Sequence, residues 1–453
     1  MIRPLLLLLL GMMLAGCATQ PSISTAPAPP SHPQWVASLG SARLPKLVDE
    51  ALANQPGIHA ALARFDAARA QASIADAAGL PLLEGVFDGN RSRTNIVGRT
   101  SPGSARAVTT NRYSLTVQAS WEADLWRRLD DRQAASRADA LAVRADLEAA
   151  RLLLAAQVAK AWFALLEADG QARLAADEVI NFRETLKIIR RRYQAGLGDA
   201  LDLRLARENL SSAQARLALR QQRVDAASRV LETLLGRYPE RLLTADETLP
   251  QDIAAIPAGL SVQLVQRRPD VRAARQRLFA ALHRQADASK NLLPDLRLTA
   301  SSGGSSTDLK RLLDPDYLIW SIAARLTQPI FNGGRLEAER KLASARRDEA
   351  LANYGDQLLK AFREIETTLA AEPLLRQQMA HFKDSVKSLR AAERLALSRY
   401  KAGLTTITTL LDTERRAYSA QRNLLASQLQ WLNNRIDLHV ALGGDFDHRE
   451  DEP

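Results

Sequence analysis

The chain has 453 residues, 46% of them hydrophobic and 25% charged, which excludes wholesale disorder and allows several domains or one large duplicated architecture. Its formal net charge is +10, and arginine accounts for most of the cations. The arginines are spread along helical stretches among Asp and Glu and form no basic runs with aromatic neighbours, which argues against nucleic-acid binding.

The N-terminus has the features of a secretory signal, because Arg3 precedes an apolar run over residues 5–14 that is too short to span a bilayer comfortably. Residues 14–17, Leu-Ala-Gly-Cys, resemble a bacterial lipobox, which implies cleavage before Cys17 and a covalent lipid on it. Cys17 is the only cysteine, so an intramolecular disulfide is impossible. An ordinary signal peptide that contains a cysteine is the alternative. Ala18, where Asp would favour the inner membrane, points to the outer membrane.

We therefore expect residues 1–16 to be a lipoprotein signal peptide and residues 17–42 to be a lipidated, flexible tether, rich in Pro, Ser and Ala. No later segment has 18 or more consecutive apolar residues, so we expect no transmembrane helix after the signal. A membrane crossing would then require β-strands closed into a barrel, because unpaired backbone groups are too costly in lipid.

Two stretches show the period-two alternation of membrane strands. Apolar and polar residues alternate strictly over residues 113–125, and the pattern recurs from Trp320. Weaker strand candidates precede them at 82–95 and 295–304, with Gly-, Ser-, Thr- and Asp-rich loops between. The predicted β-hairpins span about 82–125 and 295–331. The candidates for an interfacial aromatic girdle are Tyr113, Trp121 and Trp320.

Four strands are too few to close a barrel, for which eight is about the practical minimum. Either the hairpins pack on another part of the molecule, or several copies of the chain contribute strands to one barrel; three copies would supply twelve. A small soluble β-domain inserted among helices is the alternative that alternation alone leaves open.

Long helices account for most of the remaining chain. Residues 130–195 contain no proline and a single glycine. Apolar residues recur there at alternating spacings of four and three for over five heptads, which predicts coiled-coil packing. The positions are Leu154, Val158, Ala161, Leu165, Ala168, Ala172, Ala175, Val179, Phe182, Leu186, Ile189 and Tyr193. Nine of the twelve positions 207 residues later are also apolar. A helix of roughly 65 residues would be about 100 Å long.

Each long helix leads into nearly the same motif, RYQAGL from Arg192 and RYKAGL from Arg399. Gly196 and Gly403 stand where a helix C-cap favours a left-handed residue, so each motif predicts the turn of a helical hairpin. Aligned without gaps, residues 192–236 and 399–443 share fourteen identities over forty-five positions. The chain is therefore one unit written twice.

The first repeat covers residues 43–236, with a helix, the β-hairpin, a long helix at about 128–195 and a returning helix at about 200–236. A linker over 237–258 leads to the second repeat, 259–444, with its long helix at about 334–402 and its returning helix at about 406–442. A C-terminal tail follows over 445–453.

In combination, these residues resemble the TolC/OprM-like outer-membrane factors, specifically the NodT-type branch of outer-membrane efflux lipoproteins. The most specific marks are Arg-Arg-Pro-Asp at 267–270, the two Tyr-x-Ala-Gly-Leu turns, and TQPIFNGGR over 327–335. The resemblance implies a mainly α fold with membrane β: a homotrimer whose twelve-stranded outer-membrane β-barrel continues into a long periplasmic α-helical barrel.

The resemblance also implies a function and partners. The duct would passively conduct drugs, toxic compounds or metal ions out of the cell, with an inner-membrane pump of the RND type, a periplasmic adaptor and outer-membrane lipid as partners. A periplasmic adaptor and a structural coiled-coil lipoprotein are the alternatives. Two equally spaced helical hairpins argue against the first, and the amphipathic strands argue against both.

In this family, carboxylates at the periplasmic ends of the helical hairpins form rings that favour cations. The corresponding candidates in the first repeat are Asp199 and Asp202, whereas the second repeat has Thr405 and Thr406, a departure that leaves a cation preference open. An N-cap for the returning helix is the other interpretation of Asp199. The resemblance makes Leu197 and Leu404, with the neighbouring Gly196 and Gly403, candidates for adaptor contact.

The remaining motifs predict no chemistry. There is no phosphate-binding Gly-x-x-x-x-Gly-Lys-Ser/Thr loop and no His-Glu-x-x-His, and the six histidines have no ligand spacing, so we expect no enzyme, no metal site and no cofactor beyond the lipid on Cys17. The set that a reader could take for a catalytic cluster is Arg267, Arg268, Pro269 and Asp270. Proline and aspartate suit the first turn of a helix, so we expect a structural role.

Overall fold

The computed structural model describes residues 33–97, 105–253, 256 and 262–444. The predicted signal peptide, the lipidation site Cys17 and the C-terminal tail lie outside these residues. The chain divides into two compact units. The helical unit comprises Met1–Asp66, Ala145–Arg272 and Asp356–Pro453, and the sheet unit comprises Ala67–Arg144 and Ala273–Gly355.

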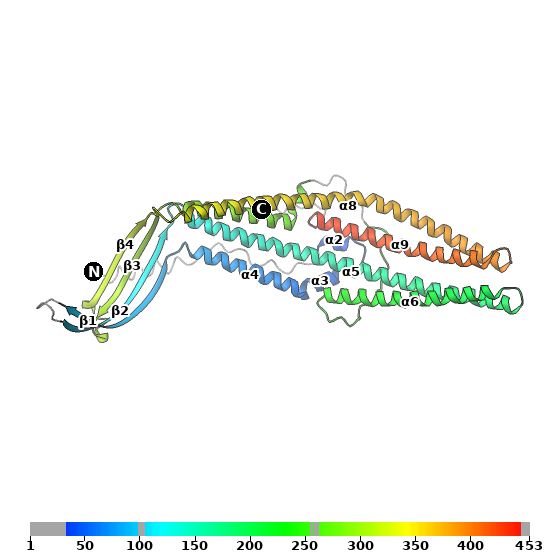
Figure 1. Cartoon of the computed structure of the whole chain (residues 1–453), viewed down its shortest axis with the longest axis horizontal. Coiled ribbons are helices and arrows are strands. Elements are labelled where there is room, and N and C mark those ends of the chain that lie inside the picture. Colours follow the sequence, from blue (N-terminus) through cyan, green and yellow to red (C-terminus); the bar gives the residue numbers. More distant parts are fainter. Residues whose placement is uncertain (1–32, 98–104, 254–255, 257–261, 445–453) are drawn as a thin grey trace. The chain divides into compact units, whose positions relative to one another are not determined.

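The same order of elements occurs twice along the chain (Figure 1). After the short helix α2 (Gln34–Ala37), the first copy contains α3 (Leu44–Asn54), α4 (Pro56–Ala77), β1 (Leu82–Val97), β2 (Ala105–Ala123), α5 (Arg128–Gln194) and α6 (Ala200–Leu234). The second contains η2 (Val262–Arg267), α7 (Pro269–Lys290), β3 (Asp295–Ser306), η3 (Leu309–Arg311), η4 (Pro315–Tyr317), β4 (Leu318–Thr327), α8 (Arg335–Lys401) and α9 (Ile407–Ala441). The predicted long and returning helices coincide with α5, α6, α8 and α9 within about two residues.

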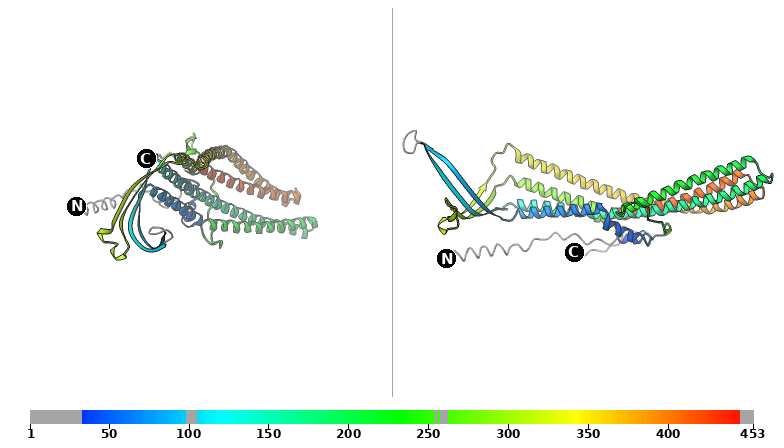
Figure 2. Two further views of the ribbon diagram at one scale, coloured as in Figure 1. Left: turned by 60° about the vertical axis from the view of Figure 1, so that its left-hand side comes forward. Right: turned by 90° about the horizontal axis from the view of Figure 1, so that it is seen from below.

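The apolar seam explains why α5 and α8 persist for 67 residues each. Every seam position of α5 is buried or half-buried except Tyr193, at the end of the helix, and all twelve equivalent positions of α8 are at least half-buried. In both views of Figure 2, α6 runs back along α5 and α9 runs back along α8. Long helices are therefore stabilised here by tertiary packing of one face, as helices in proteins generally are.

Among the described residues, α5 alone is long and apolar enough to cross a membrane by length and composition, with a mean hydropathy of 1.4 in its most apolar window. However, 56% of that window is buried inside the structure. Trp162, Phe163 and Leu166 of α5 belong to the main hydrophobic core of the helical unit. Such burial is typical of a helix in the core of a folded unit.

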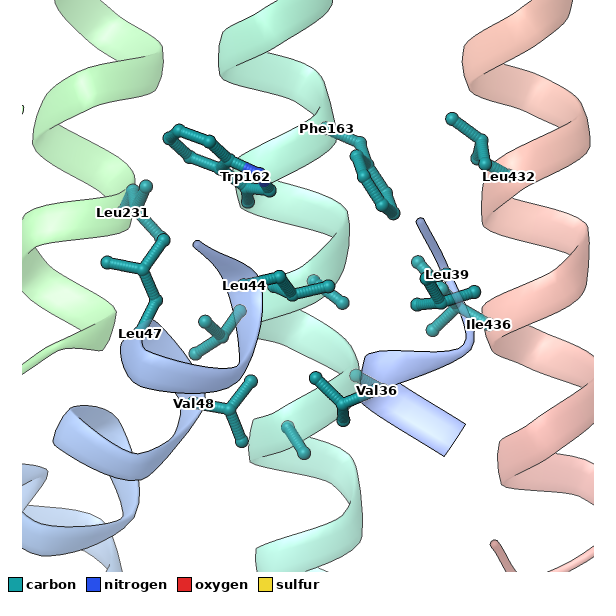
Figure 3. Close-up of a cluster of buried hydrophobic side chains, with 14 of the residues drawn as sticks. Val36, Leu39, Leu44, Leu47, Val48, Trp162, Phe163, Leu231, Leu432 and Ile436 are labelled. Atoms are coloured by element: carbon teal, nitrogen blue, oxygen red, sulfur yellow. The ribbon is translucent and has the colours of Figure 1, made fainter. Parts of the chain in front are cut away.

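The main core of the helical unit includes the segment just before the first repeat (Figure 3). Val36 and Leu39, with Leu44 and Val48 of α3, lie among side chains of α5, α6 and α9. Trp162 Nε1 donates to Ser41 Oγ at 3.0 Å. The prediction of a tether extending to residue 42 is therefore wrong for residues 34–42, because their apolar side chains are removed from water, which stabilises them in place.

The linker between the repeats is held by the same segment. Glu247 accepts from Ser41 Oγ at 2.6 Å and from the backbone N–H of Arg43 at 3.1 Å. At the end of α6, Glu232 accepts the backbone N–H groups of residues 241–243. Burial alone would raise the pKa of Glu232, but these three donors hold it below its ordinary value.

The sheet unit contains one antiparallel sheet in the order β1-β2-β3-β4. Leu82 pairs with Ser120, Tyr113 with Ser306, and Asp295 with Thr327. The two predicted hairpins thus pair with each other through β2 and β3. Within one chain, β1 and β4 each have one edge without a partner strand among the described residues.

Two strands extend further into the predicted loops than expected. Residues 105–111 begin β2, and residues 305–306 end β3, two residues beyond the predicted strand 295–304. Gly303 lies within that predicted strand, where a Cβ would lie 2.0 Å from the carbonyl oxygen of Leu115. Glycine here permits a close strand approach instead of marking a loop.

Candidate functional site: the turns of the helical hairpins

The turn between α5 and α6 has the geometry that its glycine predicts. Gly196 has φ +72°. The N–H of Leu197 donates to the carbonyl of Arg192 at 2.8 Å, and the N–H of Gly196 donates to that of Tyr193 at 3.0 Å. This pair of bonds is a Schellman motif, which satisfies carbonyls left unpaired at a helix C-terminus.

The turn between α8 and α9 repeats this geometry 207 residues later. Gly403 has φ +74°, and the N–H groups of Leu404 and Gly403 donate to the carbonyls of Arg399 and Tyr400 at 2.9 and 3.0 Å. The prediction that both motifs form helical turns is confirmed. The identical local geometry explains why the motif is written twice.

Each returning helix begins with a side-chain cap. Asp199 is the N-cap of α6 and accepts the N–H of Leu201 at 3.3 Å. Thr406 is the N-cap of α9 and accepts the N–H of Thr409 at 3.4 Å. The capping interpretation of Asp199 therefore has a direct contact in its favour. Asp202 lies in the first turn of α6, where a carboxylate is favoured by the helix dipole.

The tips of both turns present an apolar side chain to solvent. Leu197 is 67% exposed and Leu404 is 76% exposed. Thr405, beside Leu404, is half-buried. Two exposed leucines thus stand at equivalent places, each carried by a glycine turn, and their contact with an adaptor stays a prediction.

One contact between the turns was missed in the sequence. Arg192 at the end of α5 lies over the ring of Tyr400 at the end of α8, with Cζ 5.3 Å from the ring centroid. Its guanidinium also donates to the carbonyls of Lys401 at 3.5 Å and Leu197 at 3.4 Å. Arg192 thereby joins the two tips. The repeated Arg-Tyr pair was the available signal, but nothing in it indicates that an arginine from one copy contacts a tyrosine from the other.

A layer of buried polar side chains further along the helices was also missed. Glu178 of α5 is almost fully buried and binds one arginine from each returning helix, Arg216 of α6 at 2.8 Å and Arg422 of α9 at 3.2 Å. Because one carboxylate neutralises two cations from different helices, this cluster connects α5, α6 and α9 at one level.

The Arg-Arg-Pro-Asp motif lies at the start of α7, where its geometry agrees with a structural role. Pro269 opens the helix, and Asp270 stands in its first turn. The buried guanidinium of Arg268 binds Asp270 and Glu364 at 2.7 Å each and donates to the carbonyl of Ala441 at 3.0 Å. Burial would raise the pKa of Asp270, but the bonds from Arg268 hold it below its ordinary value. Arg267 ends the preceding 3-10 helix.

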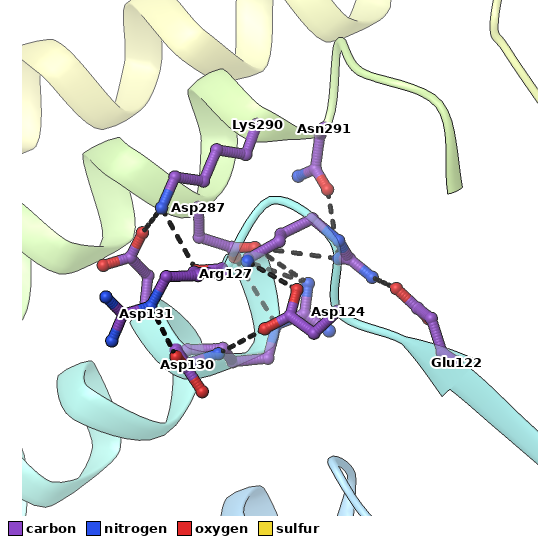
Figure 4. A network of polar contacts seen from close by, with 10 residues as sticks. Glu122, Asp124, Arg127, Asp130, Asp131, Asp287, Lys290 and Asn291 are labelled. Atoms are coloured by element: carbon purple, nitrogen blue, oxygen red, sulfur yellow. Dashed lines mark hydrogen bonds and ion pairs between the residues drawn. The ribbon is translucent and has the colours of Figure 1, made fainter. Parts of the chain in front are cut away.

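In the sheet unit, a polar network joins the end of β2 to the start of α5 and the end of α7 (Figure 4). Asp124 accepts the N–H groups of Arg128 at 2.6 Å and Asp130 at 2.9 Å, which caps α5. Arg128 in turn binds Glu122 and Asn291. The strand therefore enters the helix through a fixed junction and not through a free hinge.

The three predicted girdle aromatics differ in their surroundings. Trp320 is 72% exposed, Tyr113 is half-buried, and Trp121 is partly exposed with its Nε1 donating to the carbonyl of Gly79 at 3.0 Å. All ten residues of β4 are exposed, including Ile319, Ile322 and Leu326. The girdle role stays a prediction. Within the described residues, no group of three or more His, Cys, Asp or Glu could hold a metal ion.

The class of protein follows from comparison with known families. The family model described as "Outer membrane efflux protein" matches residues 47–237 and 260–444, which are the two copies of the repeat. The chain belongs to this family. It is an outer-membrane efflux channel with the TolC-like fold, so the resemblance drawn from its motifs is confirmed, as are the predicted export function and the outer-membrane location.

Individual relatives extend over almost the whole chain. It is 31% identical to the pyoverdine export outer membrane protein OpmQ of Pseudomonas putida over 467 residues, which cover 98% of both chains. It is 30% identical to the toluene efflux pump outer membrane protein TtgI of Pseudomonas putida, over 96% of this chain and 97% of that one. The solved structure of the outer-membrane channel OprN superposes with a TM-score of 0.86 at 26% identity, over 94% and 95% of the two chains.

Proposed function

We propose that three copies of this chain assemble into one continuous duct. The observation that carries the proposal is the four-stranded sheet, in which β1 and β4 each keep one edge that no described strand pairs with. Exposed edges are avoided in proteins unless another strand pairs with them. Pairing β4 of one copy with β1 of the next would join three sheets into a closed barrel of twelve strands, which is large enough to close, whereas four strands are not.

The side chains of the sheet support a membrane location for that barrel. The exposed residues of β4 include Trp320, Ile322 and Leu326. On β2, Leu115 and Val117 are exposed while Thr116 between them is buried. Apolar groups that point away from the chain on alternate positions suit contact with lipid. We assign Tyr113, Trp121 and Trp320 to the interfacial girdle and the covalent lipid to Cys17.

The helical turns then form the periplasmic end of the duct. Leu197 and Leu404, held by Gly196 and Gly403, are the contact points for a periplasmic adaptor, which connects the duct to an inner-membrane pump of the RND type. Asp199, Asp202, Thr405 and Thr406 surround the entrance. The duct itself conducts cargo passively and has no catalytic role. The relatives are named for pyoverdine and toluene, which supports small organic cargo.

The mass of the complex extracted in mild detergent from the outer-membrane fraction tests this proposal. One chain has a mass of 49.7 kDa, so three chains before processing sum to about 149 kDa (3 × 49.7). A protein mass near three chains is expected. A monomer, or a protein found with the inner membrane alone, would contradict the shared barrel.

A further inference from the structure

A buried carboxyl group in the helical unit is not used by the proposed duct. Glu414 of α9 is 1% exposed, and Thr185 of α5 donates to its Oε1 at 2.9 Å. Among the described residues, its Oε2 has no hydrogen-bond partner. No lysine or arginine pairs with Glu414 in the part of the chain that the structure describes. A buried carboxylate in this state is costly, since neither a cation nor a full set of donors replaces its hydration.

The charge of a second carboxyl group adds to that cost. Glu393 of α8 is half-buried, and its negative charge disfavours ionisation of Glu414. Asn181 of α5 donates to Glu393 Oε1 at 3.2 Å. Arg390 and Arg394 of α8 attract Glu393, but this attraction does not overcome its burial, which raises the pKa of Glu393 above the ordinary value. Two carboxyl groups therefore share one poorly solvated region with few donors.

The other charged groups around this region act elsewhere. Arg216 of α6 and Arg422 of α9 both bind Glu178 of α5. Asp177 and Glu178 of α5 add negative charge to the surroundings of Tyr418 of α9. The Tyr418 phenol is itself kept neutral, since burial raises its pKa. Within the described part of the chain, no cation is therefore directed at Glu414.

The direction of the pH effect follows from these contacts. Burial is the largest cause that raises the pKa of Glu414, and the charge of Glu393 adds to it. The bonds from Thr185 and Asn181 oppose the rise, and the net pKa is about 7. Because the pKa in the folded protein lies above the ordinary value of 4.5, the unfolding free energy is unaffected below about pH 4.5 and falls as pH rises towards 7. The packed arrangement is favoured by protonation.

We propose that Glu414 is a proton-binding site that couples pH to the packing of α9 against α5. The neutral carboxyl stays in the interior beside Thr185, whereas the ionised group draws water between the two helices and loosens their contact. α5 ends at the Gly196 turn, and α9 begins just after the Gly403 turn, so the change extends to both tips. This extension rests on the proposed function, whereas proton binding by Glu414 does not.

Among the described residues, this arrangement occurs in the second copy of the repeat alone. The position equivalent to Glu414 in the first copy is Arg207, which is exposed, and the position equivalent to Glu393 is Leu186. The duplication therefore does not account for the carboxyl pair, and α9 is the one returning helix whose buried face contains a titratable acid at this level.

Infrared difference spectroscopy of the purified full-length protein tests the proton site. The carbonyl stretch of a protonated carboxyl should titrate with a midpoint near pH 7 and be absent from Glu414→Gln, a nearly isosteric variant. Glu366→Gln removes an exposed glutamate of α8 and should retain the band. Absence of the band in the natural protein, or its persistence in Glu414→Gln, would overturn the proposal.

Two further variants keep Glu414 and shift its titration in opposite directions. Thr185→Val removes one of the two donors, with Asn181, that favour the ionised form, so the midpoint should rise by roughly 0.5–1 pH unit. Glu393→Gln removes the repelling charge, so the midpoint should fall by a similar amount. Midpoints that move together, or remain fixed, would show that the titrating group is not Glu414, even if Glu414→Gln fails to fold.

Amide hydrogen exchange measures the effect on packing. After correction for the intrinsic pH dependence of exchange, residues 178–190 and 407–418 should exchange several-fold faster at about pH 8 than at about pH 6, and Glu414→Gln should lose this difference. Equal exchange at both pH values would overturn the coupling to packing.

Conductance in planar bilayers tests the extension to the tips. A conductance independent of pH, in a protein whose carboxyl titrates, would overturn that extension and leave both the proton site and the duct in place.

Discussion

The two copies of the repeat have the same elements and the same turns, but they bury different surfaces. Of the twelve largest fully buried side chains among the described residues, seven belong to α5 and none to α8. α8 exposes large apolar side chains, among them Leu342, Leu351 and Leu359. Both copies thus keep the long helix and its apolar seam, but α5 contributes more of the buried core of the single chain.

The same contrast appears within the repeated motif. Tyr193 is 44% exposed, whereas its counterpart Tyr400 is 4% exposed under Arg192. Glu414 is buried where Arg207 is exposed. Identical residues in identical turns can therefore have different environments, and the environment is decided by which helix packs next to them. An exposed apolar face on α8 supports the proposed assembly, since such a face is expected to be covered by a partner.

The largest effect that this comparison predicts concerns the core position shared by α5 and α8. Trp162 is fully buried, and its counterpart 207 residues later is the half-buried Leu369. Trp162→Ala should lower the unfolding free energy by about 3–5 kcal/mol, and Leu369→Ala by about 1 kcal/mol. Urea unfolding followed by circular dichroism measures both. Equal losses would mean that the two copies contribute equally to the core.

Much of this architecture could be predicted from the sequence because it depends on local patterns. The seam, the glycine turns and the alternating strands each recur within a few residues, so their periodicity indicates the element. The pairing of Thr185 with Glu414 could not be predicted in this way, because it joins residues 229 apart and depends on how two helices rotate about each other. The burial of Val36 and Leu39 in the core could not be predicted for a different reason. They follow a Pro-rich segment, whose composition indicates a tether.

The next effect is the loss of stability on replacing a turn glycine. It compares the turn between α5 and α6, at Gly196, with the turn that follows α6, at Gly236. Gly236 has φ +75°, and a Cβ there would lie 2.7 Å from the carbonyl oxygen of Asn54. At Gly196 the same φ leaves open space. Gly196→Ala should therefore cost the left-handed strain alone, about 1–2 kcal/mol, and Gly236→Ala should cost more. The unfolding midpoints in urea give the order, and a Gly196→Ala loss as large as that of Gly236→Ala would contradict the steric argument.

A smaller effect concerns the arginine that joins the tips. Arg192→Ala removes the contact with the Tyr400 ring and should cost about 0.5–1 kcal/mol, as exposed cation–π pairs do. Its counterpart Arg399 has an exposed side chain, so Arg399→Ala is the matched control. Amide exchange in residues 397–406 should accelerate in Arg192→Ala and stay unchanged in Arg399→Ala. Faster exchange in both variants would show that the effect arises from the loss of a positive charge and not from the contact between the two copies of the repeat.

The last prediction separates the two roles considered for Asp199. Asparagine caps a helix about as well as aspartate, so Asp199→Asn should leave the unfolding free energy almost unchanged, whereas Asp199→Ala should lower it by about 0.5–2 kcal/mol. The charge is lost in both variants. If the carboxylate also selects ions at the entrance, Asp199→Asn should reduce cation preference in planar bilayers as much as Asp199→Ala does. Thr406→Val, which removes the equivalent cap from α9 without changing charge, should leave that preference intact. Reduced stability in Asp199→Ala with an unchanged preference in Asp199→Asn would make Asp199 a helix cap alone. The entrance would then have no acidic ring at this position, as the threonines of the second copy already indicate.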